Sequence, residues 1–149
     1  EVESRLLYDV CHNIAKIEDH QINGKSCTCV VHRKGATRAM PGQPVLVPGD
    51  MGTGSWLLEG MENNRAFASS CHGAGRLLSR SQAKKQIDGK ALKKELESKG
   101  IRVHANTPNI LSEEAPGAYK DVDEVIRLSN AAGLTKPLAR FSPLAVIKG

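Results

Sequence analysis

The stretch PVLVPGDMGTGSWLLEG, residues 44–60, contains two short apolar runs separated by a glycine-rich loop. The first run, 44–49, ends in proline and glycine and predicts a short buried strand, and the second, 55–60, predicts another strand. Glycines in the loop between them would let backbone N–H groups approach a phosphate or the edge of a base. The loop lacks the G-K-[ST] sequence of a Walker loop, so alone it is a weak sign of a nucleotide site.

Strand and helix patterns alternate irregularly on both sides of this stretch. The patterns predict strands over 26–34, 66–72 and 101–105, and one or two strands, broken at Pro143, within 137–149. They predict helices over 2–17, 75–87, 90–100 and 121–133, and a loop over 35–43. Because the order is not a regular βαβ alternation, we expect an α+β fold with a mixed sheet and flanking helices. No shift in composition marks a domain boundary, so we expect a single domain.

The composition indicates which classes of partner and which cellular compartment fit this chain. The chain has 149 residues and a net charge of +5, which favours an anionic partner such as a nucleotide or nucleic acid, although a mildly basic soluble surface is the simpler interpretation. The four cysteines form no C-x-x-C motif. The start lacks a signal-peptide core and no apolar run approaches membrane length, so we expect a cytoplasmic protein with reduced thiols and no membrane partner. The first residue is Glu and the first pattern is helical, which suggests a piece of a longer protein.

The stretch SSCHGAGRLLSR, 69–80, predicts an anion site. Glycines at 73 and 75 would let the backbone approach a phosphate, and a helix beginning at 75 would point its positive end there. Arg76 and Arg80, four residues apart, would share one face of that helix. His72 could attack phosphorus and form a covalent phosphoramidate. The alternative is a glycine-capped surface helix with two solvated arginines. A Cys71–His72 pair is excluded, since neighbours in an extended segment point to opposite faces.

Two further features are open between a functional and a structural interpretation. The basic run VHRKGATRAMPG, 31–42, would hold a phosphate backbone through Arg33, Lys34 and Arg38, or would be a solvated loop. His12 in the predicted first helix could be a metal ligand. However, no carboxylate or thiol follows it at i+3 or i+4, which favours a structural histidine.

Taken in order, these motifs resemble the RtcB family of RNA-splicing ligases. The segments that carry the resemblance are HNIA at 12–15, VHRKGATRA at 31–39, PVLVPGDMGTGSW at 44–56, SSCHGAGRLLSR at 69–80, EEAPGAYKDVDEV at 113–125 and VIKG at 146–149. The resemblance covers nearly the whole chain. It implies that residues 1–149 are the C-terminal portion of a larger RtcB-like single domain, without the N-terminal portion.

The resemblance implies a ligase that depends on GTP and Mn²⁺, in tRNA splicing or RNA repair. Such an enzyme joins RNA ends with a 3′-phosphate or 2′,3′-cyclic phosphate to a 5′-hydroxyl through a covalent histidine–GMP intermediate. His72 matches the nucleophile, His12 a Mn²⁺ ligand and Asn13 a nucleotide contact. Other implied partners are the RNA, the N-terminal portion of the ligase and an archease-type activator.

The resemblance also implies two residue sets. The implied nucleotide contacts, besides Asn13, are Pro48, Gly49, Asp50, Met51, Ser55, Gly73, Ala74, Gly75, Tyr119 and Lys148. The residues placed for RNA phosphates are Arg33, Lys34, Arg38, Arg76 and Arg80.

Two departures from the family qualify this expectation. The other Mn²⁺ ligands of the family have no counterpart here, so the isolated chain would be inactive, and Asp50 stands where many members have Ser. A non-catalytic nucleotide- or RNA-binding module is one alternative. RNA end-processing on the same scaffold is another.

Overall fold

The computed structural model describes residues 3, 5–6 and 8–149, and its first regular element is a β-hairpin. Strands β1 (Asn13–Ile22) and β2 (Lys25–Lys34) pair antiparallel along their whole length. Asn23 and Gly24 form the two-residue turn between them, both with positive φ, as tight hairpin turns require. The prediction of a helix over 2–17 is therefore wrong where the chain is described. Its apolar positions 2 and 7 lie outside the described residues.

The remaining strands form three small sheets. β3 (Ala36–Arg38) pairs antiparallel with β6 (Ser69–Cys71), and β7 (Arg102–Ala105) pairs parallel with β9 (Ala145–Lys148). The third sheet has the antiparallel order β4 (Pro44–Pro48), β5 (Ser55–Gly60), β8 (Thr135–Phe141). Both predicted strands of the stretch 44–60 are confirmed, and β3 lies where a loop was expected.

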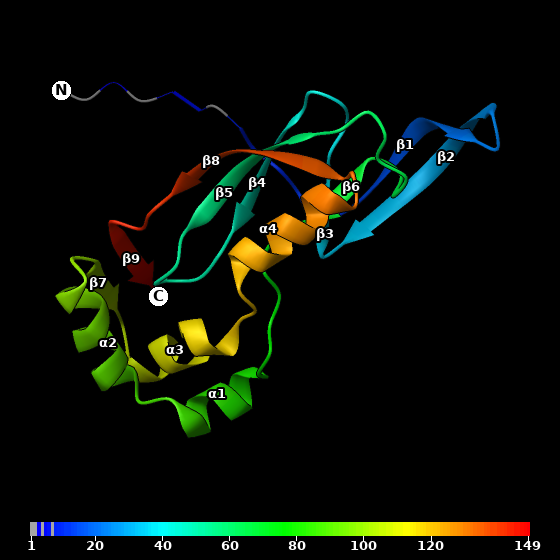
Figure 1. The fold of residues 1–149 in the computed structure, drawn as a ribbon. Helices are drawn as coiled ribbons and strands as arrows, with labels where there is room; N and C mark the ends of the chain where they lie inside the picture. Colours follow the sequence, from blue (N-terminus) through cyan, green and yellow to red (C-terminus); the bar gives the residue numbers. More distant parts are fainter. Residues whose placement is uncertain (1–2, 4, 7) are drawn as a thin grey trace.

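Four α-helices and one 3-10 turn complete the regular elements of the described residues, and the α+β class is confirmed. They are α1 (Arg80–Gln86), α2 (Gly89–Ser98), α3 (Pro108–Glu113), the 3-10 turn η1 (Pro116–Ala118) and α4 (Val122–Ala131). In Figure 1, α2 and α3 lie near β7, α1 lies next to α3, and α4 lies along the β4–β5–β8 sheet. The β1–β2 hairpin extends away from both groups. Among the described residues, no helix has the length and apolar character needed to cross a bilayer.

The helix predicted from position 75 begins later, at Arg80. Ser79 caps it, and a capping box with Gln82 fixes this start. The residues before it form an irregular segment held by long-range pairing, in which the N–H of Leu77 donates to the carbonyl of Ala118 at 2.8 Å. An isolated bridge joins Arg76 to Tyr119 in the same region. The pairing of residues 75–78 with residues 118–120 outweighs the local helical pattern of 75–79.

The molecule has two hydrophobic cores that meet at the β4–β5 loop. Val45, Val47 and Leu58 belong to a core between the three-stranded sheet and α4. Met51, in the loop, is buried in the second core together with Leu96 of α2. The loop therefore connects the two halves of the fold, and its backbone is held from both sides.

Candidate functional site

A cleft of about 380 Å³ lies where the two halves meet. The β4–β5 loop, the region after α3 and strand β9 line it. The lining residues that sequence reasoning placed at a nucleotide are Pro48, Gly49, Asp50, Met51, Ser55, Tyr119 and Lys148. The fold thus brings together residues separated by as much as a hundred positions in the sequence. Their roles toward a ligand stay predictions.

The β4–β5 loop is held in one shape by its own hydrogen bonds. The Asp50 carboxylate accepts from the backbone N–H of Gly52 at 2.8 Å and of Thr53 at 3.0 Å. A Cβ on Gly49 would lie 2.0 Å from the carbonyl oxygen of Gly54, so position 49 accepts only glycine. Asp50 therefore organises the loop. A serine hydroxyl at this position could accept the same kind of hydrogen bond.

Glu114 and Tyr119 form part of one wall of the cleft and are hydrogen-bonded to two arginines that do not line it. Arg76 donates to the hydroxyl of Tyr119 at 2.8 Å and lies over the tyrosine ring, 4.8 Å from its centroid. The tyrosine hydroxyl in turn donates to Glu114. Arg80 donates to Glu114 through Nε at 3.4 Å. Arg76 and Arg80 therefore meet at a shared carboxylate and not on one helix face, which corrects the geometry predicted for them.

This arrangement sets the charges along the wall. Burial raises the pKa of Glu114, but hydrogen bonds from Tyr119 and Arg80 and the charges of Arg76 and Lys148 outweigh it, so the pKa is lowered. Burial, together with the neighbouring Glu114 carboxylate, raises the pKa of Tyr119. The wall therefore presents an ionised carboxylate and a protonated phenol between cations at neutral pH.

His72 and His12 lie face to face next to Gly35, and neither is among the residues that line the cleft. Their ring centroids are 4.3 Å apart and the planes differ by 8°. The N–H of Gly35 donates to the carbonyl of His12 at 2.9 Å, which holds the start of β1 at the bend between β2 and β3. Burial, and then the charge of His12, lowers the pKa of His72 from the ordinary 6.5. The His72 imidazole is consequently neutral at physiological pH, with a free lone pair.

The backbone after His72 leads directly to the cleft. A Cβ on Gly73 would lie 3.5 Å from the carbonyl oxygen of Pro48, so the two segments are in close contact. Ala74 is buried in the core of the sheet, and Gly75 has a positive φ of 78° at the turn that follows. Cys71 packs against the same core, and burial raises its pKa. Cys71 and His72 thus have different surroundings, as the strand alternation predicts.

The remaining predicted contacts lie outside the cleft. Asn13 is the exposed first residue of β1, opposite Lys34, which is also exposed. Arg38 is half-buried and donates to Gln43 at 3.1 Å. Arg33, in contrast, is 2% exposed and forms a bidentate pair with Glu18 at 2.8 and 2.7 Å. Its guanidinium is therefore paired inside the protein, and its predicted contact with an RNA phosphate stays a prediction.

His12 and the residues around it do not complete a metal site. Over residues 3, 5–6 and 8–149, no group of three or more His, Cys, Asp or Glu side chains could hold a metal ion. His12 would supply one imidazole ligand. The described donor set therefore does not fit Mn²⁺ by itself.

With this geometry established, comparison with known proteins identifies the family. A family model described as tRNA-splicing ligase RtcB matches residues 1–149. The chain belongs to the RtcB family. The tRNA-splicing ligase RtcB of Thermococcus kodakarensis is 49% identical, over 100% of this chain and 34% of the relative. The RNA-splicing ligase RtcB of Mycobacterium tuberculosis is 49% identical, over 97% of this chain and 36% of the relative.

The chain spans only part of each RtcB relative. For the tRNA-splicing ligase RtcB of Pyrococcus horikoshii, which is 47% identical, the match covers 97% of this chain and 18% of the relative. About a third or less of the relatives' length is therefore represented here.

Sequence reasoning missed two carboxylates of this RtcB chain. Glu114 lies within the quoted motif EEAPGAY, but no spacing rule connects it to Tyr119, Arg76 and Arg80. Glu18 lies in the segment that was predicted as a helix, so its pairing with Arg33 across the hairpin could not be read. Even in the hairpin register Arg33 lies opposite Ile14 and Glu18 opposite Cys29, so the ion pair joins residues that are not directly paired.

Proposed function

We propose that this chain carries the nucleotide-accepting part of an RNA ligase that depends on GTP and joins 3′-phosphate or 2′,3′-cyclic phosphate ends to 5′-hydroxyl ends. The observation that carries the proposal is the position of His72. Its neutral imidazole lies one residue from a segment that contacts the cleft at Pro48. The RtcB relatives, named as RNA- and tRNA-splicing ligases, support the reaction class.

In the first step, a ring nitrogen of His72 attacks the α-phosphorus of GTP. A nitrogen–phosphorus bond forms, the bond to pyrophosphate breaks, and GMP stays on the histidine. The cleft would hold the guanosine, with Tyr119 and Lys148 on one side and the β4–β5 loop on the other. Positioning by these rigid groups supplies much of the rate enhancement in reactions of this kind.

In the next steps GMP passes to the RNA. An oxygen of the RNA 3′-phosphate attacks the GMP phosphorus and releases His72, and the 5′-hydroxyl then attacks the 3′-phosphate, loses its proton and displaces GMP. A 2′,3′-cyclic phosphate is first opened by water. Exposed Lys34 and half-buried Arg38 are the basic residues best presented to an RNA backbone near His72.

The proposed cofactor Mn²⁺ would be bound partly by His12. When bound, such an ion withdraws charge from a phosphoryl group. The other ligands would come from the portion of the ligase that this chain does not span. Binding and orientation of the nucleotide remain the task of the cleft residues.

The test is the mass of the complete protein after incubation with GTP and Mn²⁺. We expect an increase by one GMP in the wild type and in His104→Ala, whose exposed imidazole lies on β7, and no increase in His72→Ala. An adduct that persists in His72→Ala would refute the assignment. Absence of any adduct, with RNA binding retained, would indicate a non-catalytic binding module.

A further inference from the structure

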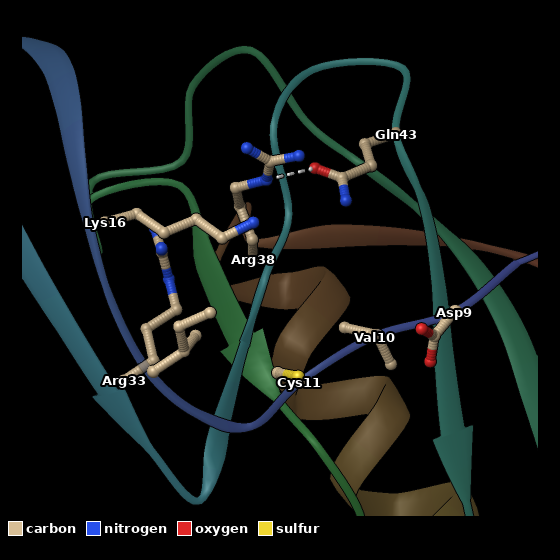
Figure 2. A pocket seen from close by; sticks show the side chains of 8 residues that line it. Asp9, Val10, Cys11, Lys16, Arg33, Arg38 and Gln43 are labelled. Carbon is tan, nitrogen blue, oxygen red and sulfur yellow. Dashed lines mark hydrogen bonds between the residues drawn. The ribbon is translucent and has the colours of Figure 1, made fainter.

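Two of the arginines near the candidate site differ in how many of their hydrogen-bond donors are used. Figure 2 shows the Arg38 guanidinium turned toward Gln43, to which Nε donates at 3.1 Å. Within the described residues, the terminal nitrogens of Arg38 donate to no protein group. Arg76 is different, because all three of its guanidinium nitrogens donate within the chain. Arg76 is therefore held inside the protein, whereas Arg38 keeps free donors.

Arg76 joins three segments of the chain around Tyr119. Its Nε donates to the carbonyl oxygen of Leu78 at 2.9 Å, and Nη2 donates to the carbonyl oxygen of Glu113, the last residue of α3. Nη1 donates to the Tyr119 hydroxyl at 2.8 Å, and the guanidinium carbon lies 4.8 Å from the centroid of the tyrosine ring. The planar guanidinium thereby holds Tyr119 by its hydroxyl and by its ring.

Glu114 holds Tyr119 from a second direction. The Tyr119 hydroxyl donates to Oε2 of Glu114, while Arg76 Nη1 and Arg80 Nε each lie 3.4 Å from Oε1. The Glu114 side chain is 20% exposed, so water screens its charge only in part. Removal of this carboxylate would leave the Tyr119 hydroxyl without its acceptor and Arg76 without its ion-pair partner.

The preceding carboxylate has a similar exposure but different partners. Glu113 is 22% exposed, pairs with Lys84 and lies 3.8 Å from Arg80. Within the described residues, its carboxylate makes no hydrogen bond or ion pair with Tyr119. Glu113 also does not line the cleft, whereas Glu114 does. The two neighbouring carboxylates therefore separate the holding of Tyr119 from the general neutralisation of nearby cations.

The hydrogen bonds of Tyr119 leave its ring as the part that a ligand meets. Tyr119 lines the cleft, and its hydroxyl already donates to Glu114 and accepts from Arg76. A nucleotide in the cleft would therefore contact chiefly the aromatic ring. Binding to a side chain that is already held in place costs less conformational entropy than binding to one that rotates freely.

We infer that Glu114 is a positioning residue for the guanosine of GTP, which acts with Arg76 by fixing the Tyr119 ring in the wall of the cleft. This inference rests on the proposed function, since it assigns GTP to the cleft. The effect of Glu114 passes through Tyr119, so the carboxylate itself needs no contact with the nucleotide.

The test is calorimetric titration of the complete protein with GMP, which fills the guanosine site but cannot transfer, in the presence of Mn²⁺. A parallel titration uses IMP, which lacks the 2-amino group of guanine. The variants are Glu114→Ala, Glu114→Gln, Tyr119→Phe and the double variant Glu114→Ala/Tyr119→Phe. Glu113→Ala is the matched control. Circular dichroism establishes that each variant is folded.

Glu114→Ala should weaken GMP binding about fivefold, which is part of what a hydrogen bond to a charged group contributes. Glu114→Gln should weaken it about twofold, because its amide oxygen still accepts from Tyr119 but carries no charge. Tyr119→Phe should resemble Glu114→Ala, and the double variant should bind no more weakly than the weaker single variant, because both changes remove the same bond. Each loss should be equal for IMP, and Glu113→Ala should bind as the wild type does.

Wild-type affinity in Glu114→Ala, or losses that multiply in the double variant, would overturn the inference. So would a loss for GMP that is absent for IMP, because Glu114 would then contact the guanine amino group directly. If Glu114→Ala does not fold, Glu114→Gln replaces it in the same series, and wild-type affinity in Glu114→Gln would overturn the inference.

The proposed function fails in a different way. A wild type that binds GMP but forms no adduct with GTP and Mn²⁺ would refute the proposed transfer, whereas the Glu114 series would still measure the positioning role. A wild type that does not bind GMP would overturn both.

Discussion

At the scale of single residues, the Glu18–Arg33 pair holds the β1–β2 hairpin to the rest of the chain. Arg33 donates to both oxygens of Glu18, and also to the hydroxyl of Ser69 at 2.9 Å and the carbonyl of Phe67 at 2.8 Å. It thereby connects β2 to the segment that leads into β6 and His72. Two buried charges in such a network depend on each other, since removal of either leaves the other unpaired.

Glu18→Ala should therefore lower the free energy of unfolding by about 3–5 kcal/mol at neutral pH. The pKa of Glu18 is lowered from 4.5, chiefly by its hydrogen bond to Arg33. A carboxyl whose folded pKa is depressed stabilises the protein above its unfolded pKa and loses this contribution as pH falls through the folded value. The difference between wild type and variant should thus narrow below pH 4.5.

Urea unfolding at a series of pH values measures this difference. Glu62→Gln, at an exposed turn, is the control and should track the wild type throughout. A gap between Glu18→Ala and wild type that stayed constant from neutral pH to well below 4.5 would show that the ion pair does not act as described.

At the scale of elements, the two short helices α1 and α3 differ in how they begin. Ser79 accepts from the N–H of Gln82 at 3.2 Å, whereas Thr107 makes no side-chain capping bond. Ser79→Ala should cost about 1 kcal/mol of stability, and Thr107→Ala close to nothing. Chemical denaturation of both variants gives the comparison. Equal losses would mean that the capping box does not hold the start of α1.

The β4–β5 loop permits a second matched comparison. A Cβ at position 49 would collide with the Gly54 carbonyl, whereas a Cβ at position 117 would meet only Ile87 at an ordinary 3.9 Å. Gly49→Ala should therefore displace the loop and reduce GTP affinity at least tenfold, a loss of roughly 1.4 kcal/mol. Gly117→Ala should bind GTP as the wild type does. Calorimetric titration of both variants with GTP measures the two affinities.

These elements also show what the sequence could predict. The strands around 44–60 were readable because their apolar runs are short and bounded by proline and glycine. Residues 14 and 17 suggested a helix, although Ile17 is exposed and opposite Val30 in the hairpin. Strand pairing, specified by the Asn23-Gly24 turn, outweighed the local spacing. The irregular, non-helical conformation of 75–79 is paired with residues 118–120 and so could not be read locally.

At the scale of the whole molecule, the candidate site exists only because two cores meet. The cleft takes residues from the β4–β5 loop, the η1 region and β9, and Gly73, the residue after His72, lies close to Pro48 of the cleft. The family resemblance predicted most of the cleft residues, whereas composition and spacing alone did not. The stacking of His12 on His72 follows from the β3–β6 pairing and the bend at Gly35, which no local pattern specifies.

The central claim is that His72 accepts GMP, and the most direct measurement is the position of the adduct. The complete protein is incubated with GTP and Mn²⁺, digested under mildly alkaline conditions, and the peptides are sequenced by mass spectrometry. The account predicts GMP on His72 and its loss in mild acid, as expected for a phosphoramidate. GMP found reproducibly on another residue, with His72 unmodified, would contradict it.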